Sequence, residues 1–126
     1  MNTRNVGILG ETICSRFLER RGYMILARNY RKKWGELDIV AFKDGIIHFC
    51  EVKSTGLSHK IGFRDKHVPE EKVHWSKLAA LRRTAQTFLL ETGRGTDYPF
   101  CFHVFSVYID IEKRVFRVRW IKNVVL

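Results

Sequence analysis

The dipeptide Asp44-Gly45 is the feature that most constrains the fold of this chain, because it lies between two extended, apolar-rich segments at residues 35–43 and 46–53. Asp-Gly is among the strongest short-range signals for a two-residue β-hairpin turn. If these two residues form the loop, antiparallel pairing keeps the sum of the two residue numbers constant in every cross-strand pair. The turn therefore predicts a hairpin with a defined register.

This register gathers charged side chains at one end of the hairpin. It places Asp38 opposite Glu51 and Glu36 opposite Lys53, and the period-two alternation of a strand puts all four on one face. Opposed carboxylates destabilise a sheet unless a shared proton, a basic side chain or a metal ion neutralises them. Hard cations such as Mg²⁺ bind carboxylate oxygens together with water and phosphate. The pattern therefore indicates a nuclease-like site for Mg²⁺ or Mn²⁺.

An exposed ladder with Glu36 paired to Lys53 is the alternative interpretation of the same charges. Apolar residues on the same face weigh against it, because they predict that the charged cluster lies at one end of a buried sheet: Val40, Phe42, Ile47 and Phe49. The pair of acids, rather than Lys53 alone, is the evidence for a metal site.

The composition fits one globular domain over residues 1–126, since 45% of the residues are hydrophobic and 29% are charged. Lysine and arginine number 23 against 13 acidic residues, which gives a formal charge of +10. Such an excess in a small domain favours polyanions, and nucleic acid is the leading partner. Solubility alone and attraction to an anionic membrane surface are the alternatives, although no basic amphipathic membrane helix is evident.

The three cysteines, Cys14, Cys50 and Cys101, are odd in number and lie in apolar segments, which favours reduced thiols in a reducing compartment. The N-terminus lacks the apolar region of a secretory signal, and no stretch has membrane-spanning length. We therefore expect a cytoplasmic protein. The five histidines do not show the linear spacing of metal ligands, so zinc is not indicated, and His48 is interpreted as a strand residue.

The apolar periodicity predicts the order helix, three strands, helix, two strands. We expect a helix at residues 5–21, a strand at 23–30, the hairpin at 35–53, a helix that begins at Pro69 and ends before Gly93, and a second hairpin at 100–121. Leu9, Ile13 and Phe17 mark the buried stripe of the first helix. The hairpin is apolar on both faces and must be covered on both, which predicts a central sheet flanked by helices.

Residues 54–69 are expected to form a long basic loop, and long ordered loops are often functional. Basic side chains in this loop, in the segment between the first strand and the hairpin, and on the second helix are the candidate nucleic-acid ligands: Arg31, Lys32, Lys33, Lys60, Arg64, Lys66 and Lys77. Trp34, Trp75 and Trp120 receive no such role, because aromatic residues in a small domain more often pack in the core.

Several ordered motifs carry a resemblance to a known family. They are Gly10-Glu11, Gly22-Tyr23, Ile25-Leu26-Ala27-Arg28-Asn29-Tyr30-Arg31, Gly35-Glu36-Leu37-Asp38-Ile39-Val40-Ala41 and Glu51-Val52-Lys53. In this order they resemble the core of the PD-(D/E)XK nuclease superfamily and, more closely, the small bacterial endonuclease-like YraN family. The resemblance implies an α/β (α+β) fold of the restriction-endonuclease type, with a central mixed sheet flanked by helices in the order αβββαββ.

The same resemblance implies roles for individual residues. Asp38 and Glu51 would hold Mg²⁺ with the carbonyl of Val52, and Lys53 would orient the attacking water or stabilise charge on the phosphate. Glu11 would approach the site from the first helix. The fold is similar to that of archaeal Holliday junction resolvases, which implies branched or irregular DNA as a substrate, and a two-fold junction would suit a homodimer.

Two departures from the family pattern leave the function open. The family continues Glu-Val-Lys with Thr-Arg, whereas this chain has Ser54-Thr55, and a late Arg-Phe-Asp is here Val104-Phe105-Ser106. A metal-dependent DNA endonuclease is favoured by the intact acids and lysine. A noncatalytic nucleic-acid-binding module is the second hypothesis, and an assembly protein with an acidic partner is the third. The substrate and any sequence preference do not follow from the sequence.

Overall fold

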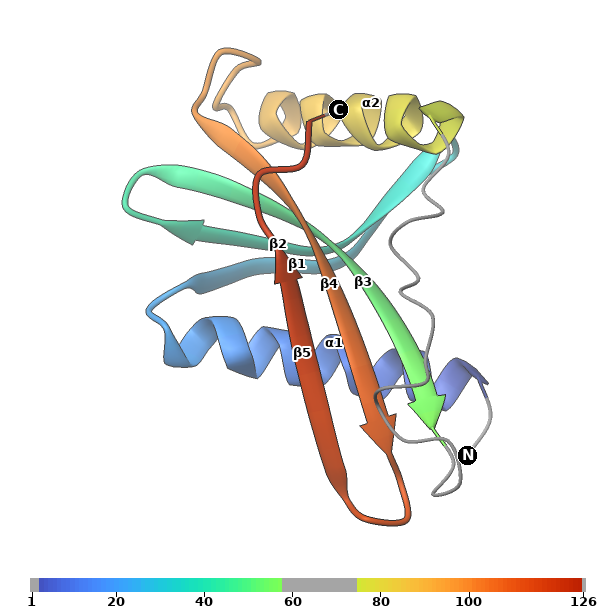
Figure 1. Cartoon of the computed structure of the whole chain (residues 1–126). Helices are drawn as coiled ribbons and strands as arrows, with labels where there is room; N and C mark the ends of the chain where they lie inside the picture. The colour runs from blue at the N-terminus through green and yellow to red at the C-terminus, as the bar shows by residue number, and fades with distance from the viewer. Residues whose placement is uncertain (1–2, 58–74, 126) are drawn as a thin grey trace.

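The computed structural model describes residues 3–57 and 75–125. Its elements, in chain order, are α1 (Thr3–Arg20), β1 (Met24–Lys32), β2 (Gly35–Lys43), β3 (Ile46–Leu57), α2 (Trp75–Glu91), β4 (Phe100–Asp110) and β5 (Val115–Ile121). The predicted order αβββαββ is confirmed. The two helices lie on opposite sides of the sheet (Figure 1).

The five strands form one mixed sheet in the order β1-β2-β3-β4-β5. The pair β3–β4 is parallel, whereas the other neighbouring pairs are antiparallel. Parallel neighbours need a crossover connection, and α2 lies in the segment that makes it. The central strand β3 therefore meets α1 on one face, α2 on the other, and a strand on each edge.

The turn at Asp44-Gly45 has the geometry that the sequence predicts. Asp44 has φ 52° and Gly45 has φ 78°, and a type I′ hairpin turn requires positive φ at both central residues. The β2–β3 ladder runs from Lys43 opposite Ile46 to Ile39 opposite Cys50, which confirms the predicted register over this length.

Strand β3 continues further than expected. Ser54 to Leu57, predicted as the start of the basic loop, pair in parallel with Val107 to Asp110 of β4. The sequence Ser-Thr-Gly carries little strand signal, but β4 supplies a hydrogen-bonding partner for it along its whole length. The remainder of the predicted loop and the predicted helix start at Pro69 lie outside the described residues.

Helix α1 packs on one face of the sheet, but the side chains that it buries are not the ones predicted. Val6, Cys14 and Leu18 are buried, whereas the predicted residues Leu9, Ile13 and Phe17 are partly buried at the margins of the contact. Gly10 explains the shift, because a Cβ placed there would lie 2.8 Å from Cβ of Ser54 on β3. The small residue lets the helix approach the sheet closely.

Helix α2 covers the other face as predicted. Its buried side chains Leu81, Ala85, Phe88 and Leu89 form a cluster with sheet residues Leu37, Val40, Ile47, Phe49 and Phe102. The three cysteines are free thiols, as expected, with Cys14 and Cys50 buried and Cys101 partly exposed. Among the described segments, neither helix is both long and apolar enough to cross a membrane.

Candidate functional site

The predicted acids meet where β2 and β3 separate. The ladder ends at Ile39 and Cys50, and the next residue on each strand is Asp38 or Glu51. Each of these acids is only 7% exposed. The backbone N–H of Val52 donates to Oδ2 of Asp38 at 2.7 Å, so a side chain provides the link between the strands beyond the ladder.

Two lysines lie against Glu51. Lys77 of α2 donates from Nζ to Oε1 of Glu51 at 2.8 Å, and Nζ of Lys53 lies 3.4 Å from the same oxygen. Both lysines were predicted as functional residues, Lys53 beside the reacting phosphate and Lys77 on the nucleic acid. The structure brings both ammonium groups to one buried carboxylate.

The electrostatics differ between the two acids. Burial, followed by the charge of Glu51, raises the pKa of Asp38 from 3.8 to about 7, although the hydrogen bond from the N–H of Val52 acts in the opposite direction. Burial lowers the pKa of Lys53. Burial also lowers the pKa of Lys77, but the hydrogen bonds with Glu51 and Lys53 and the charges of Glu51 and Asp38 together outweigh burial, so its pKa is raised overall. Glu51 thus has two ammonium groups beside it, whereas the contact of Asp38 is with an uncharged N–H.

Glu11 reaches the same region from α1. Its side chain is 18% exposed and its Oε1 lies 3.9 Å from the guanidinium of Arg28. Its charge contributes to the raised pKa of Asp38, as does the charge of Glu36. The helix thus brings a third carboxylate within electrostatic range of Asp38.

Glu36 does not form the predicted pair with Lys53. It lies opposite Arg31 of β1, and its Oε2 is 3.0 Å from Nε of that arginine in an exposed ion pair. The extrapolated register was wrong at this point, because the ladder between the described strands β2 and β3 stops at Ile39 and Cys50. The exposed-ladder interpretation fails for the same reason.

The predicted nucleic-acid ligands are in different environments. Lys32 is paired with Glu91 at 2.6 Å, and Arg31 is paired with Glu36, whereas Lys33 is exposed between β1 and β2. The loop residues Lys60, Arg64 and Lys66 lie outside the described residues. Ser106, which departs from the family pattern, is fully buried and directly opposite Lys53 in the β3–β4 ladder.

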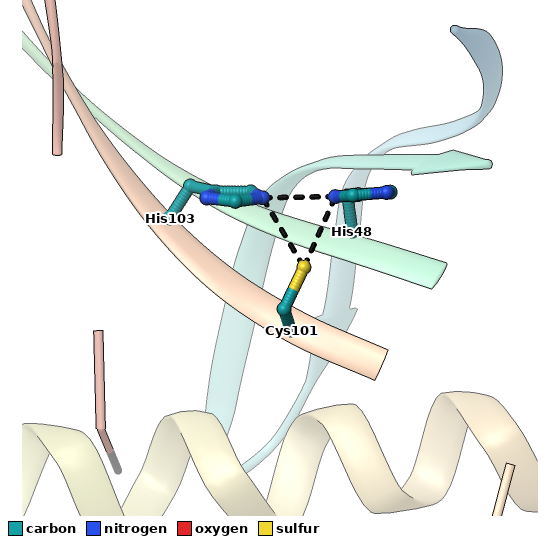
Figure 2. A group of neighbouring side chains, drawn as sticks. All are labelled: His48, Cys101 and His103. Carbon is teal, nitrogen blue, oxygen red and sulfur yellow. Dashed lines mark hydrogen bonds between the residues drawn. The ribbon is translucent and has the colours of Figure 1, made fainter. Parts of the chain in front are cut away.

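A second polar cluster, which linear spacing did not reveal, joins His48, Cys101 and His103 (Figure 2). Burial lowers the pKa of both imidazoles, that of His103 to about 4, so both rings are uncharged at neutral pH. The signal that would have found this group is the parallel register of β3 and β4, which sets His48 opposite Cys101.

Sequence comparisons identify a family and several relatives of this chain. The model of a family described as "Uncharacterised protein family UPF0102" matches residues 10–111. A UPF0102 protein of Alkaliphilus metalliredigens is 40% identical over 113 residues, covering 90% of this chain and 93% of its own length. One of Caldicellulosiruptor saccharolyticus is 37% identical over 123 residues, 98% of each chain. One of Campylobacter jejuni is 37% identical over 92 residues, 73% of this chain and 75% of its own.

The matched residues include every motif on which the YraN-like resemblance rests, from Gly10-Glu11 to Glu51-Val52-Lys53. The relatives from Alkaliphilus and Caldicellulosiruptor align with 90% and 98% of this chain, respectively. The chain therefore belongs to the UPF0102 family, the YraN-like, nuclease-like family that its sequence motifs resemble.

Proposed function

We propose that this protein is a divalent-metal-dependent nuclease that hydrolyses phosphodiester bonds in DNA. The observation that carries the proposal is the pair of buried acids, Asp38 and Glu51, at the point where β2 and β3 separate, with Lys53 beside them. Burying two neighbouring carboxylates and a lysine lowers the stability of the folded state, so these residues are not explained by folding alone. The presence of both acids and the lysine in one place fits a role in binding a cation and a phosphate.

The donor set fits Mg²⁺ or Mn²⁺. Hard divalent cations prefer carboxylate oxygens and keep several waters, so two acids suffice on the protein side. Asp38 and Glu51 are the residues that would hold the cation, and the contacts described above engage Oδ2 of Asp38 and Oε1 of Glu51. When bound, such an ion supplies Lewis-acid activation of water and charge stabilisation at the phosphate.

Three other residues would position water, stabilise charge and orient the acids. Lys53 holds a cationic group 3.4 Å from Glu51, where it can orient a water molecule and stabilise negative charge on a phosphate oxygen. Val52 fixes the Asp38 carboxylate through its N–H. Glu11 acts from α1 as a further acid that biases the charge state of Asp38.

The substrate class follows from charge. The formal charge of +10 favours a polyanion, and exposed Lys33 at the β1–β2 turn is available for phosphate contacts. We extend the proposal to branched or irregular DNA and to a dimer that would act on a two-fold junction. A cytoplasmic location fits the three free thiols.

A noncatalytic nucleic-acid-binding module is the second candidate, and one observation favours it. The ammonium of Lys77 already occupies Oε1 of Glu51 at 2.8 Å, which neutralises part of the charge that a metal ion would otherwise neutralise. In such a module the same basic surface would bind DNA without cleavage.

The test is cleavage of a four-way junction, single-stranded DNA and linear duplex in Mg²⁺, in Mn²⁺ and in chelator, with Glu51→Gln as the site variant. Exposed Glu19 on α1 supplies the matched control, because Glu19→Gln makes the same change of charge at an exposed position. Metal-dependent cleavage that is lost in Glu51→Gln and kept in Glu19→Gln supports the nuclease. Binding to DNA with no cleavage of any substrate supports the module.

A further inference from the structure

His48, Cys101 and His103 come together through the register of the parallel strands. His48 of β3 lies directly opposite Cys101 of β4, and His103 follows two residues later on the same face of β4. Neighbouring strands are about 4.8 Å apart and residues two apart on one strand are about 6.7 Å apart, so the three side chains converge on one point. The cluster is a product of strand pairing rather than of a linear motif.

The three donor atoms form a compact triangle. Nδ1 of His48 and Nε2 of His103 are 2.8 Å apart, and Sγ of Cys101 lies 3.1 Å from the first and 3.3 Å from the second. Figure 2 shows the two ring nitrogens and the sulfur directed toward one another. In tetrahedral zinc sites the corresponding edges are about 3.3 Å for two nitrogens and about 3.6 Å for nitrogen and sulfur. Conversion requires these edges to lengthen by about 0.3 to 0.5 Å. It also requires both rings to tilt, because their nitrogens face each other at 2.8 Å.

The triangle also leaves room for a fourth ligand. A point about 2.1 Å from the nitrogens and about 2.3 Å from the sulfur lies about 1 Å outside the plane of the three atoms. An ion at that point has one open coordination position on the side away from the protein ligands. Cys101 is partly exposed, so water can reach this residue of the group.

Aromatic side chains hold the two imidazoles in place. The ring of Tyr23 meets His48 edge to face at 4.9 Å, and that of Trp120 meets His103 at 5.3 Å. The two imidazoles are nearly coplanar, with an interplanar angle of 11°.

In the metal-free chain, a hydrogen-bonded network accounts for the same contacts. The backbone N–H of Asn123 donates to Nδ1 of His103 at 3.3 Å, so the His103 proton lies on Nε2 and points to Nδ1 of His48. Binding of an ion releases the thiol proton of Cys101 and moves the His103 proton from Nε2 to Nδ1 by exchange with water. The long contact with Asn123 breaks in this process.

We propose that Nδ1 of His48, Sγ of Cys101 and Nε2 of His103 bind one Zn²⁺, with water as the fourth ligand. Two imidazoles and a thiolate suit zinc and do not suit Mg²⁺. The ion fastens the first residues of the parallel β3–β4 pair to each other. The site is separate from the acid cluster, since His48 and Glu51 are about 10 Å apart along β3 and on opposite faces.

The test is metal analysis of the full-length chain, followed by replacement of the bound metal with Co²⁺. We expect about one Zn²⁺ per chain and a thiolate-to-cobalt charge-transfer band, which reports a sulfur ligand directly. Cys101→Ser should abolish the band, and His103→Gln should weaken zinc binding at least about 100-fold. Cys14→Ala is the matched control, because it removes a buried thiol of α1 and leaves the ligands intact.

A parent chain that binds less than a tenth of an equivalent of zinc, or whose Co²⁺ complex lacks the thiolate band, overturns the proposal in favour of the hydrogen-bonded network. The same holds if the band persists in Cys101→Ser. These two measurements on the parent do not require the variants to fold. Zinc bound at the acid cluster would lack the thiolate band and would be displaced by excess Mg²⁺, so failure of the proposed nuclease leaves this result unaffected.

Discussion

Glu51 and His48 lie three residues apart on β3, yet they belong to clusters of opposite chemistry on opposite faces of the sheet. Glu51 has two ammonium groups beside it on the face that α2 covers, and Asp38 is within electrostatic range of both Glu51 and Glu11 of α1. The His48 cluster gathers two uncharged imidazoles and a thiol on the other face. One strand therefore presents donor sets that suit Mg²⁺ and Zn²⁺, respectively.

The difference shows how each cluster is built. The acids stand near each other because a two-residue turn folds β2 back onto β3, and this turn is encoded within a few residues. His48 and Cys101 are 53 residues apart in sequence and meet only because β4 pairs in parallel with β3. Local turn chemistry produces the first cluster, and a long-range strand pairing produces the second.

The largest expected effect is a loss of DNA cleavage that leaves zinc binding unchanged. Glu51→Gln should reduce metal-dependent DNA cleavage by on the order of 100-fold or more, because it removes a charge at the reacting centre. The same variant should bind zinc as the parent does, since His48 and its partners lie on the other face. Cleavage rates and zinc content measured on one preparation check both halves. Loss of zinc from Glu51→Gln would show that the clusters are coupled.

The next effect concerns the packing that brings α1 to the acid cluster. Gly10→Ala should destabilise the protein by about 2–3 kcal/mol, because the new Cβ would lie 2.8 Å from Cβ of Ser54. Denaturant unfolding measures the loss. Gly7→Ala is the matched control on the same helix, since no atom of the described residues would lie within 4 Å of the new Cβ. Adding Ser54→Gly to Gly10→Ala should recover most of the loss, and no recovery would place the strain elsewhere.

A smaller effect depends on pH and tests the charge of the acid cluster. The pKa of Asp38 is raised from 3.8 to about 7, so the folded state binds more protons than the unfolded state in this range. The free energy of unfolding therefore falls as pH rises through this window. Asp38→Asn keeps an acceptor for Val52 and should be more stable than the parent by about 2 kcal/mol at pH 8, with no gain near pH 4.

Unfolding curves of the parent and Asp38→Asn across this pH range provide the measurement. Mg²⁺ should stabilise the parent at pH 8 more than the variant, because the ion neutralises the charge that the variant lacks. A gain of equal size at pH 4 and pH 8 would mean that Asp38 does not titrate in this window.

The smallest effect tests a single surface charge. Lys33→Ala should weaken DNA binding a few-fold and reduce the slope of log affinity against log salt by about 1, because one phosphate contact is lost. Fluorescence anisotropy at several salt concentrations measures both. Lys32→Ala is the comparison, since Lys32 is held by Glu91 at 2.6 Å and should change the slope less. Equal slopes for Lys33→Ala and the parent would exclude this residue from the interface.

Most of the fold followed from local patterns. The element order and the Asp44-Gly45 turn were predicted, because each is encoded by spacing or by turn residues that act over a few positions. Predictions failed where a distant partner decided the outcome. Gly10 moved the buried row of α1, and β4 extended β3 through Leu57.

The sequence by itself determined that two acids and a lysine would lie close together at one end of the β2–β3 hairpin, because turn geometry fixes register over short distances. Only the tertiary structure decided which partners these residues have. Lys77 arrives at Glu51 from α2, Glu36 pairs with Arg31 instead of Lys53, and His103 joins His48 across the parallel pair. Such contacts depend on how helices and strands far apart in the chain pack together, and no short-range pattern records that arrangement.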